Sequence, residues 1–131
     1  NETKRLGYYL GMEFGNQYYP VGHIFYKGVF QALDENGYSK QFHTQTPPHN
    51  SIEEIFSSAL PTKPSVIVPF NTETSLQIVR RAPKLLIRLI GFLYTPKTQE
   101  FVEEYPLNQF DAFIYLRNTT PEKRFTMKFA P

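Results

Sequence analysis

The sequence predicts the α/β class (mixed α+β), with a mixed sheet of five to six strands, a β-hairpin and two to three packing helices. Segments with strand-like composition interleave with segments of helical periodicity, and an Asn-Gly pair separates two strand-like runs. The 131 residues are 40% hydrophobic and 16% aromatic, which is enough apolar surface for a core. We therefore expect one domain over residues 1–131.

The first expected elements are a helix and a strand. Apolar residues keep helical spacing over residues 3–14, which predicts an amphipathic helix that ends at Gly15 and Asn16. Two glycines four positions apart in this helix, Gly7 and Gly11, would let another backbone approach one side closely. Aromatic and β-branched residues over 18–26 predict a strand that Gly28 breaks.

A β-hairpin and a second helix follow. Strands over residues 29–33 and 38–44 flank a turn at 34–37, whose Asn-Gly pair tolerates positive φ. Ser51 with Glu54 three residues later forms a capping-box pattern. Apolar residues at helical spacing then predict a helix with one buried face: Ile52, Ile55, Phe56, Ala59 and Leu60.

The second half of the chain is expected to contribute the remaining strands. The predicted elements are a short strand at 66–68, a short helix at 74–81, a strand at 85–94, a loop at 95–108 with a helical turn around 99–104, and a buried strand at 110–116. The densest basic run, which includes Lys84 and Arg88, alternates with apolar residues and is interpreted as a solvated face.

Composition argues against several classes of partner. The net charge of +2 is too weak and too scattered to predict a nucleic-acid partner. No run of residues is long and apolar enough to predict a membrane span. The absence of cysteine excludes disulfides, thiolate metal sites and cysteine nucleophiles, but both the bacterial cytoplasm and export remain compatible with it.

The sequence contains no complete catalytic motif, and no cofactor or metal site is predicted. It has neither a Gly-x-Ser-x-Gly elbow nor a His-Glu-x-x-His run. His23 lies within a predicted strand, where a hydrogen-bonded structural role competes with a catalytic one, and His43 is expected to face solvent. His49 occupies a loop position that could line a pocket. Glu53 lies in the first turn of the second helix, where its charge complements the helix dipole.

Four segments, read in order, resemble the carboxyl-terminal part of the erythromycin esterase-like family. Residues 6–10 (LGYYL) are similar to its Met-Gly-x-x-Leu helix, and residues 15–30 (GNQYYPVGHIFYKGVF) to its Gly-Asp-x-Tyr-x-x-Ile-Gly-Phe-x-Phe-x-x-Gly-x-Phe strand. Residues 47–53 (PPHNSIE) resemble its Pro-Pro-x-Gly-Ser-Leu-Glu helix start. Residues 109–121, with QFDAFIYL and TTP, resemble its closing Phe-Asp-Ala-Leu-Ile strand and Thr-Thr-Pro.

The resemblance also has departures and a clear implication. His23 stands where the family typically has Phe, Asn50 where it has Gly, and the middle of the chain from about 60 to 109 is only loosely similar. In this family, His and Glu residues that activate water lie in earlier segments, including an Ala-His-Asn motif just upstream. The resemblance therefore implies a carboxylic ester hydrolase whose catalytic residues are absent from this chain.

Two functional hypotheses follow. The first is a non-catalytic C-terminal structural or pocket-lining domain of such a hydrolase, with His23, Tyr26 and His49 as candidate ligand-binding residues. Its partner would be the upstream part of its own parent chain, and self-association is expected if a face is left uncovered. The beginning at Asn1, without an initiator Met, is typical of a fragment or processed product. The alternative is a stand-alone binding or assembly module derived from the same fold, without hydrolase activity.

Overall fold

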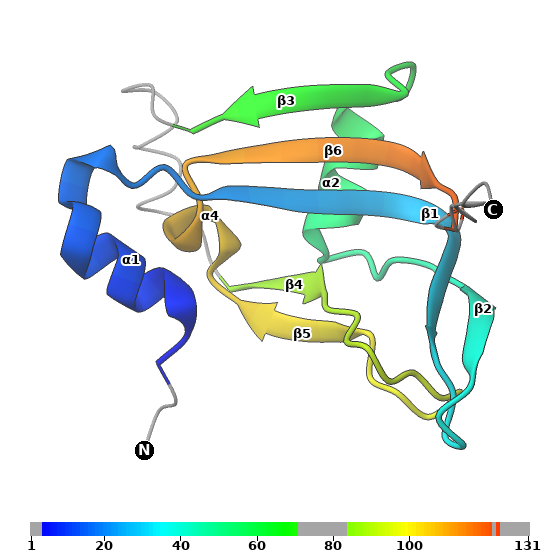
Figure 1. Ribbon diagram of the computed structural model, residues 1–131. Coiled ribbons are helices and arrows are strands. Elements are labelled where there is room, and N and C mark those ends of the chain that lie inside the picture. The colour runs from blue at the N-terminus through cyan, green and yellow to red at the C-terminus, as the bar shows by residue number, and fades with distance from the viewer. Residues whose placement is uncertain (1–3, 71–83, 122, 124–131) are drawn as a thin grey trace, which may run out of the picture.

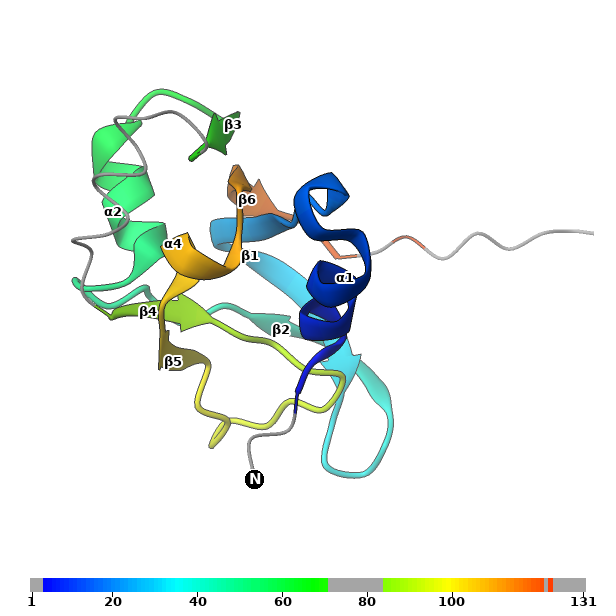
Figure 2. The same ribbon diagram turned by 90° about the vertical axis from the view of Figure 1, so that its left-hand side faces the viewer.

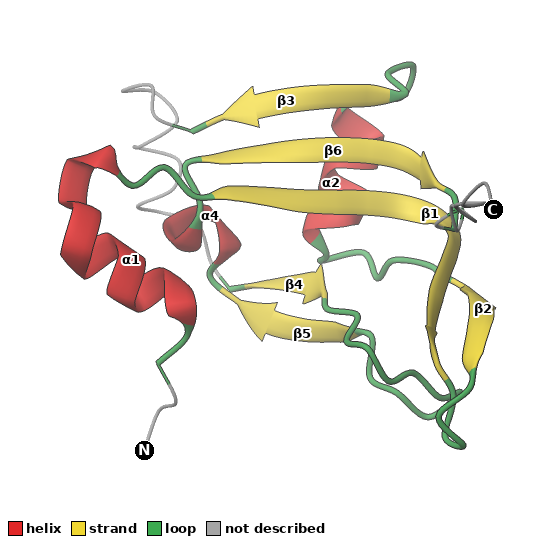
Figure 3. Cartoon of the chain, in the orientation of Figure 1, coloured by secondary structure: helices red, strands yellow, loops and turns green. Residues whose placement is uncertain are grey.

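The computed structural model describes residues 4–70, 84–121 and 123, and it has the expected α+β fold (Figure 1, Figure 3). A four-stranded mixed sheet has the order β2-β1-β6-β3, and β4 and β5 form a separate two-stranded sheet. The elements are α1 (Leu6–Phe14), the 3-10 turn η1 (Gly15–Gln17), β1 (Val21–Leu33), β2 (Ser39–His43), α2 (Ile52–Ala59), β3 (Ser65–Pro69), β4 (Leu85–Arg88), β5 (Phe101–Glu104), the single turn α4 (Pro106–Gln109) and β6 (Ala112–Thr119).

The long strand β1 pairs with two other strands, β6 and β2. Its first half pairs in parallel with β6, and its second half pairs antiparallel with β2, from Val29 opposite His43 to Leu33 opposite Ser39. The predicted hairpin is therefore confirmed. The predicted break at Gly28 is wrong: this residue has φ +146° and lies within the continuous strand where the partner changes. Only glycine adopts such a backbone conformation without strain.

Helix α2 begins as the sequence predicts. Ser51 adopts an extended backbone, and its side-chain oxygen accepts a hydrogen bond from the backbone N–H of Glu54 at 3.2 Å. The same hydroxyl donates to the carbonyl of Pro48 at 2.6 Å, which ties the helix start to the preceding loop. The capping residue thereby satisfies one of the backbone donors that a helix start leaves without an intrahelical partner.

The region after β3 differs most from expectation. The helix predicted at 74–81 lies outside the described residues. The strand predicted at 85–94 ends at Arg88, and its antiparallel partner β5 occupies a segment that was expected to be loop with a helical turn. Phe101 and Val102 favour a strand and the two glutamates after them do not, so this four-residue segment is ambiguous by itself and the pairing with β4 decides its conformation.

Helix α1 forms as predicted, but none of its residues is fully buried, and only the side with Gly7, Leu10 and Gly11 is half-buried. Leu6 is 72% exposed and Met12 71% exposed. A Cβ at Gly7 would lie 3.0 Å from the hydroxyl of Tyr18. The group that packs closely against this glycine is therefore a side chain and not the backbone of another segment.

The core lies on one face of the four-stranded sheet. Ile24, Phe113 and Tyr115 point to this face and pack with Ile52 of α2 and Ile87 of β4. Figure 2 shows α2 and the β4–β5 pair on one side of β1 and β6, with α1 on the other. A second, smaller cluster of Phe30, Ala32 and Tyr94 lies beneath the hairpin.

Candidate functional site

The structure contains two features with functional chemistry: a buried charge cluster and a surface pocket, which share the backbone of β1 and of the loop after β2. The charge cluster joins β4, β5 and α2 through Arg88, Glu100 and Glu53, all of which are buried. The pocket lies on the solvent side of the same backbone and is lined by residues of β1, β2, the following loop and β6.

Arg88 is the centre of the charge cluster. Its Nε donates to Glu100 at 2.6 Å, and the two side chains are 2% and 0% exposed. Its Nη1 donates to the carbonyls of Phe25 and Tyr26, and its Nη2 donates to the carbonyl of Gln45 at 2.8 Å. The interpretation of Arg88 as part of a solvated face was therefore wrong. The guanidinium donates to carbonyls of β1 and of the loop after β2, and so joins these two segments from the interior.

Glu100 is held by neutral donors as well as by Arg88. The backbone N–H of Gln45 donates to both of its oxygens, at 3.3 and 3.1 Å, and the hydroxyl of Tyr94 donates to Oε2 at 2.8 Å. Burial, followed by this hydrogen bond, raises the pKa of Tyr94 to about 12. The phenol therefore remains a protonated donor to the carboxylate across the physiological pH range.

Glu53 is less well satisfied. Its Oε1 accepts the backbone N–H of Arg88 at 2.9 Å, while its buried Oε2 has no hydrogen-bond partner among the described residues. Burial raises the pKa of Glu53 above its usual value near 4.5. The sequence interpretation, a charge complementing the helix dipole, missed this tertiary role because nothing in the local pattern identifies β4 as the partner.

Glu53→Gln is expected to change how stability depends on pH. Because the folded-state pKa of Glu53 lies above the unfolded value near 4.5, its contribution to stability is fully present below that value and is lost as the pH rises through the folded pKa. The glutamine variant lacks this loss, so its free energy of unfolding relative to the native protein should increase from acidic to neutral pH. Urea unfolding at several pH values measures the difference.

The matched control for this experiment is Glu54→Gln. It removes a carboxylate from the same helix turn at a half-buried position whose side chain accepts a hydrogen bond from Ser58. A stability difference between Glu53→Gln and the native protein that stays constant with pH would contradict the role assigned to Glu53.

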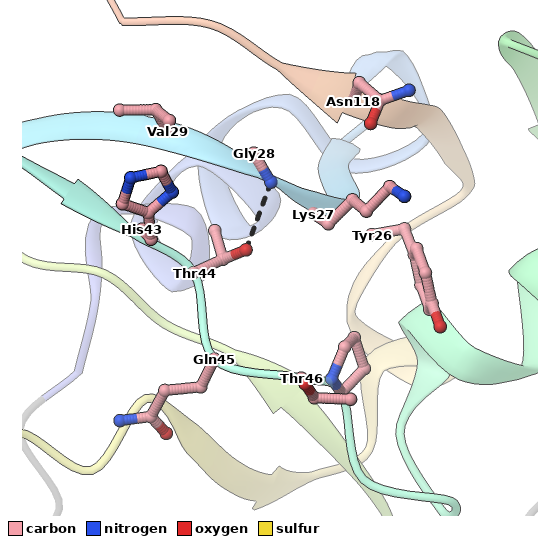
Figure 4. Close-up of a pocket in the computed structure, with 10 residues that line it drawn as sticks. Tyr26, Lys27, Gly28, Val29, His43, Thr44, Gln45, Thr46 and Asn118 are labelled. Carbon is pink, nitrogen blue, oxygen red and sulfur yellow. Dashed lines mark hydrogen bonds between the residues drawn. The ribbon is translucent and has the colours of Figure 1, made fainter.

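The surface pocket has a volume of about 440 Å³ and lies where β1 changes partners (Figure 4). Its position is fixed by two hydrogen bonds between Gly28 and Thr44: the N–H of Gly28 donates to Oγ1 at 3.1 Å, and the N–H of Thr44 donates to the Gly28 carbonyl at 3.0 Å. The lining residues are Tyr26, Lys27, Gly28, Val29, His43, Thr44, Gln45, Thr46, Pro47 and Asn118.

The three residues proposed from the sequence for ligand binding do not share this pocket. Tyr26 lines it, whereas His23 is exposed on the opposite face of the sheet and His49 is exposed in the loop before α2. His43 is exposed, as expected, and also lines the pocket. The sequence assigned no ligand-binding role to Lys27, Thr44 or Asn118, because these common surface residues come together only in the folded chain.

Within residues 4–70, 84–121 and 123, no group of three or more His, Asp or Glu side chains is placed to hold a metal ion. Among the same residues, no helix is long and apolar enough to cross a membrane.

Comparison with known proteins decides the family. Residues 1–119 match the sequence family described as erythromycin esterase, over nearly the whole chain. The chain belongs to the erythromycin esterase family. This confirms the resemblance drawn from the sequence motifs at residues 6–30, 47–53 and 109–121.

Two solved structures share the fold of this erythromycin esterase family segment. A protein from Bacillus cereus is 15% identical with a TM-score of 0.73, over 87% of this chain and 28% of its own. A succinoglycan biosynthesis protein is 17% identical with a TM-score of 0.73, over 89% of this chain and 28% of its own. The segment thus spans less than a third of the proteins that it resembles, and no curated protein sequence matches it.

Proposed function

We propose that this chain is a non-catalytic C-terminal segment of an erythromycin esterase-like carboxylic ester hydrolase, in which it supplies the sheet against which the rest of the enzyme packs. The observation that carries this proposal is the uncovered face of the four-stranded sheet. Residues paired across β1, β6 and β3 share a face, so His23, Ile114 and Ile67 form one row on the side opposite the core.

This outer face is unusually apolar for a solvated surface. Ile67 is 67% exposed, Val21 is exposed, and Ile114 and Leu116 are half-buried. Helix α1 adds further exposed apolar side chains beyond one end of the sheet (Figure 1). Contiguous apolar surface of this kind marks a contact surface, and the larger relatives contain additional chain that could cover it.

His23 acquires a specific place in this proposal. It lies between apolar neighbours on the outer face, where the packed remainder of a hydrolase would enclose it, so its candidate role is at the junction of the two parts. Tyr26 and His49 remain candidates for ligand contact at separate places on the segment.

The first test combines activity and self-association of the 131-residue protein. We expect no hydrolysis of macrolide lactones or simple aryl esters above the buffer rate, and concentration-dependent association in light scattering. Ile67→Glu should reduce that association, because it places a charge in the middle of the outer face. Tyr38→Glu removes an equally exposed apolar side chain from the hairpin tip and should not.

Turnover by this chain alone would contradict the proposal. A strictly monomeric protein would favour the alternative, a stand-alone module derived from the same fold. The coding sequence upstream of Asn1 gives an independent test: an in-frame Ala-His-Asn segment, with His and Glu motifs further back, supports the hydrolase, and an unrelated domain there contradicts it.

A further inference from the structure

The pocket at the bend of β1 has pre-organised walls. Two hydrogen bonds join Gly28 to Thr44 on one side, and Arg88 holds the carbonyls of Tyr26 and Gln45 from the buried side. β6 runs beside the first half of β1 and places Asn118 directly opposite Lys27 in the strand register. The pocket is therefore framed by hydrogen-bonded backbone, so its main-chain walls are already in place for a ligand.

Among the described residues, the lining is rich in hydrogen-bond donors and contains no carboxylate. Lys27 supplies a positive charge, and among the hydrogen bonds and ion pairs of the described residues its side chain and that of Asn118 are not engaged. Because Thr44 Oγ1 accepts from the N–H of Gly28, its proton is available to donate into the pocket. Glu100, which accepts the backbone N–H of the lining residue Gln45 from the buried side, is paired with Arg88.

Figure 4 shows how these groups are arranged. Lys27, Tyr26 and Asn118 lie toward one end of the opening, and His43 and Thr44 toward the other. A cation flanked by neutral donors, without a competing acid, suits an oxyanion, since charge-assisted hydrogen bonds to phosphate or carboxylate oxygens are the strongest that such a lining can make.

We propose that this pocket binds an anionic group, a phosphate or a carboxylate, through Lys27, Asn118 and Thr44. The site lies where β1 changes its partner from β6 to β2, and all of its lining residues belong to this chain. It also differs from the three residues that the sequence suggested, of which only Tyr26 takes part in the lining.

Titration of the full chain with inorganic phosphate and, separately, with acetate tests the proposal by two-dimensional NMR at constant ionic strength. We expect saturable shifts centred on the amides of Gly28, Thr44 and Gln45. Lys27→Ala should weaken binding about tenfold or more, the effect of losing a charged hydrogen bond. Asn118→Ala should weaken it less, because a neutral donor is lost.

Lys40→Ala is the matched control, because it removes the same charge from an exposed position on β2 that does not line the pocket. Saturation by phosphate, by acetate or by both, sensitive to Lys27 and insensitive to Lys40, supports the site and identifies the ligand chemistry. Shifts spread over all lysines, equal effects of the two alanine variants, or no saturable shift would overturn it. Spectra of the variants also report whether each one remains folded.

Discussion

Replacing Arg88 with methionine is expected to lower the free energy of unfolding by about 3–5 kcal/mol, the cost of removing one partner from a buried ion pair. The loss follows from the groups left behind. Glu100 would remain fully buried without a counter-charge, and the carbonyls of Tyr26 and Gln45 would lose the donor that reaches them in the interior. Chemical denaturation followed by circular dichroism measures the change, since the chain has no tryptophan.

Two further variants separate charge from packing at this position. Arg88→Met combined with Glu100→Gln removes both charges of the ion pair and should recover part of the stability, because Glu100 is no longer left buried without its counter-charge. Arg5→Met, which breaks the exposed 3.5 Å pair with Glu104, should cost less than about 1 kcal/mol. An Arg88→Met variant as stable as Arg5→Met would contradict the assigned role.

The contrast between Arg88 and Ser51 indicates what a sequence can and cannot predict here. The cap of α2 was predictable because Ser51 and Glu54 lie three residues apart, and the structure confirms the hydrogen bond from the N–H of Glu54 to the side chain of Ser51. The reciprocal half of the capping box does not form, because the N–H of Ser51 donates to the carbonyl of Pro48. Arg88 was predicted to be solvated because its local pattern alternates with apolar residues. Its carbonyl partners, in Tyr26 and Gln45, lie more than forty residues away in the sequence. No local pattern therefore identifies them as acceptors for Arg88.

The same distinction explains the strands. The hairpin was predictable from its turn, where Asp34 Oδ1 accepts the N–H groups of Asn36 and Tyr38 and Gly37 has φ +80°. Gly28 was interpreted as the end of a strand because glycine usually interrupts one. In the structure β1 continues through the bend at Gly28, because its pairing passes from β6 to β2 there. No local sequence pattern signals such a switch between paired strands.

The pocket follows from the same bend and could not be predicted. Lys27 and Asn118 are brought together by the parallel register of β1 and β6, and Thr44 reaches Gly28 only because the hairpin folds back. The family, by contrast, could be recognised from ordered motifs, since recognition does not require knowledge of which residues meet. The family to which the chain belongs could therefore be predicted from the sequence. The pocket could not, because its residues meet only in the tertiary structure.

Phe113→Ala is expected to destabilise the protein by about 3–5 kcal/mol, as for other large-to-small changes of fully buried aromatic residues. Phe113 is 0% exposed, and its ring packs against those of Phe56, Phe70 and Phe110, at centroid distances of 6.1, 5.6 and 5.1 Å. The alanine variant leaves a cavity between the sheet and α2 that these rings can fill only by moving from their present packing. Urea unfolding measures the loss.

Gly22 provides a test that distinguishes this specific packing from general loss of hydrophobicity. A Cβ at Gly22 would lie 2.7 Å from Cδ1 of Phe113, so Gly22→Ala should destabilise the native protein by forcing the ring aside. In the Phe113→Ala background that obstacle is gone, and only the Phe110 ring at 3.2 Å still has to yield. We therefore expect the same substitution to cost less there, with a coupling free energy of about 1–3 kcal/mol. Additive effects of the two substitutions would show that Phe113 and Gly22 do not fix each other's positions. A coupling of the expected sign would show that the missing side chain at Gly22 leaves the space that the Phe113 ring occupies on this face of the sheet.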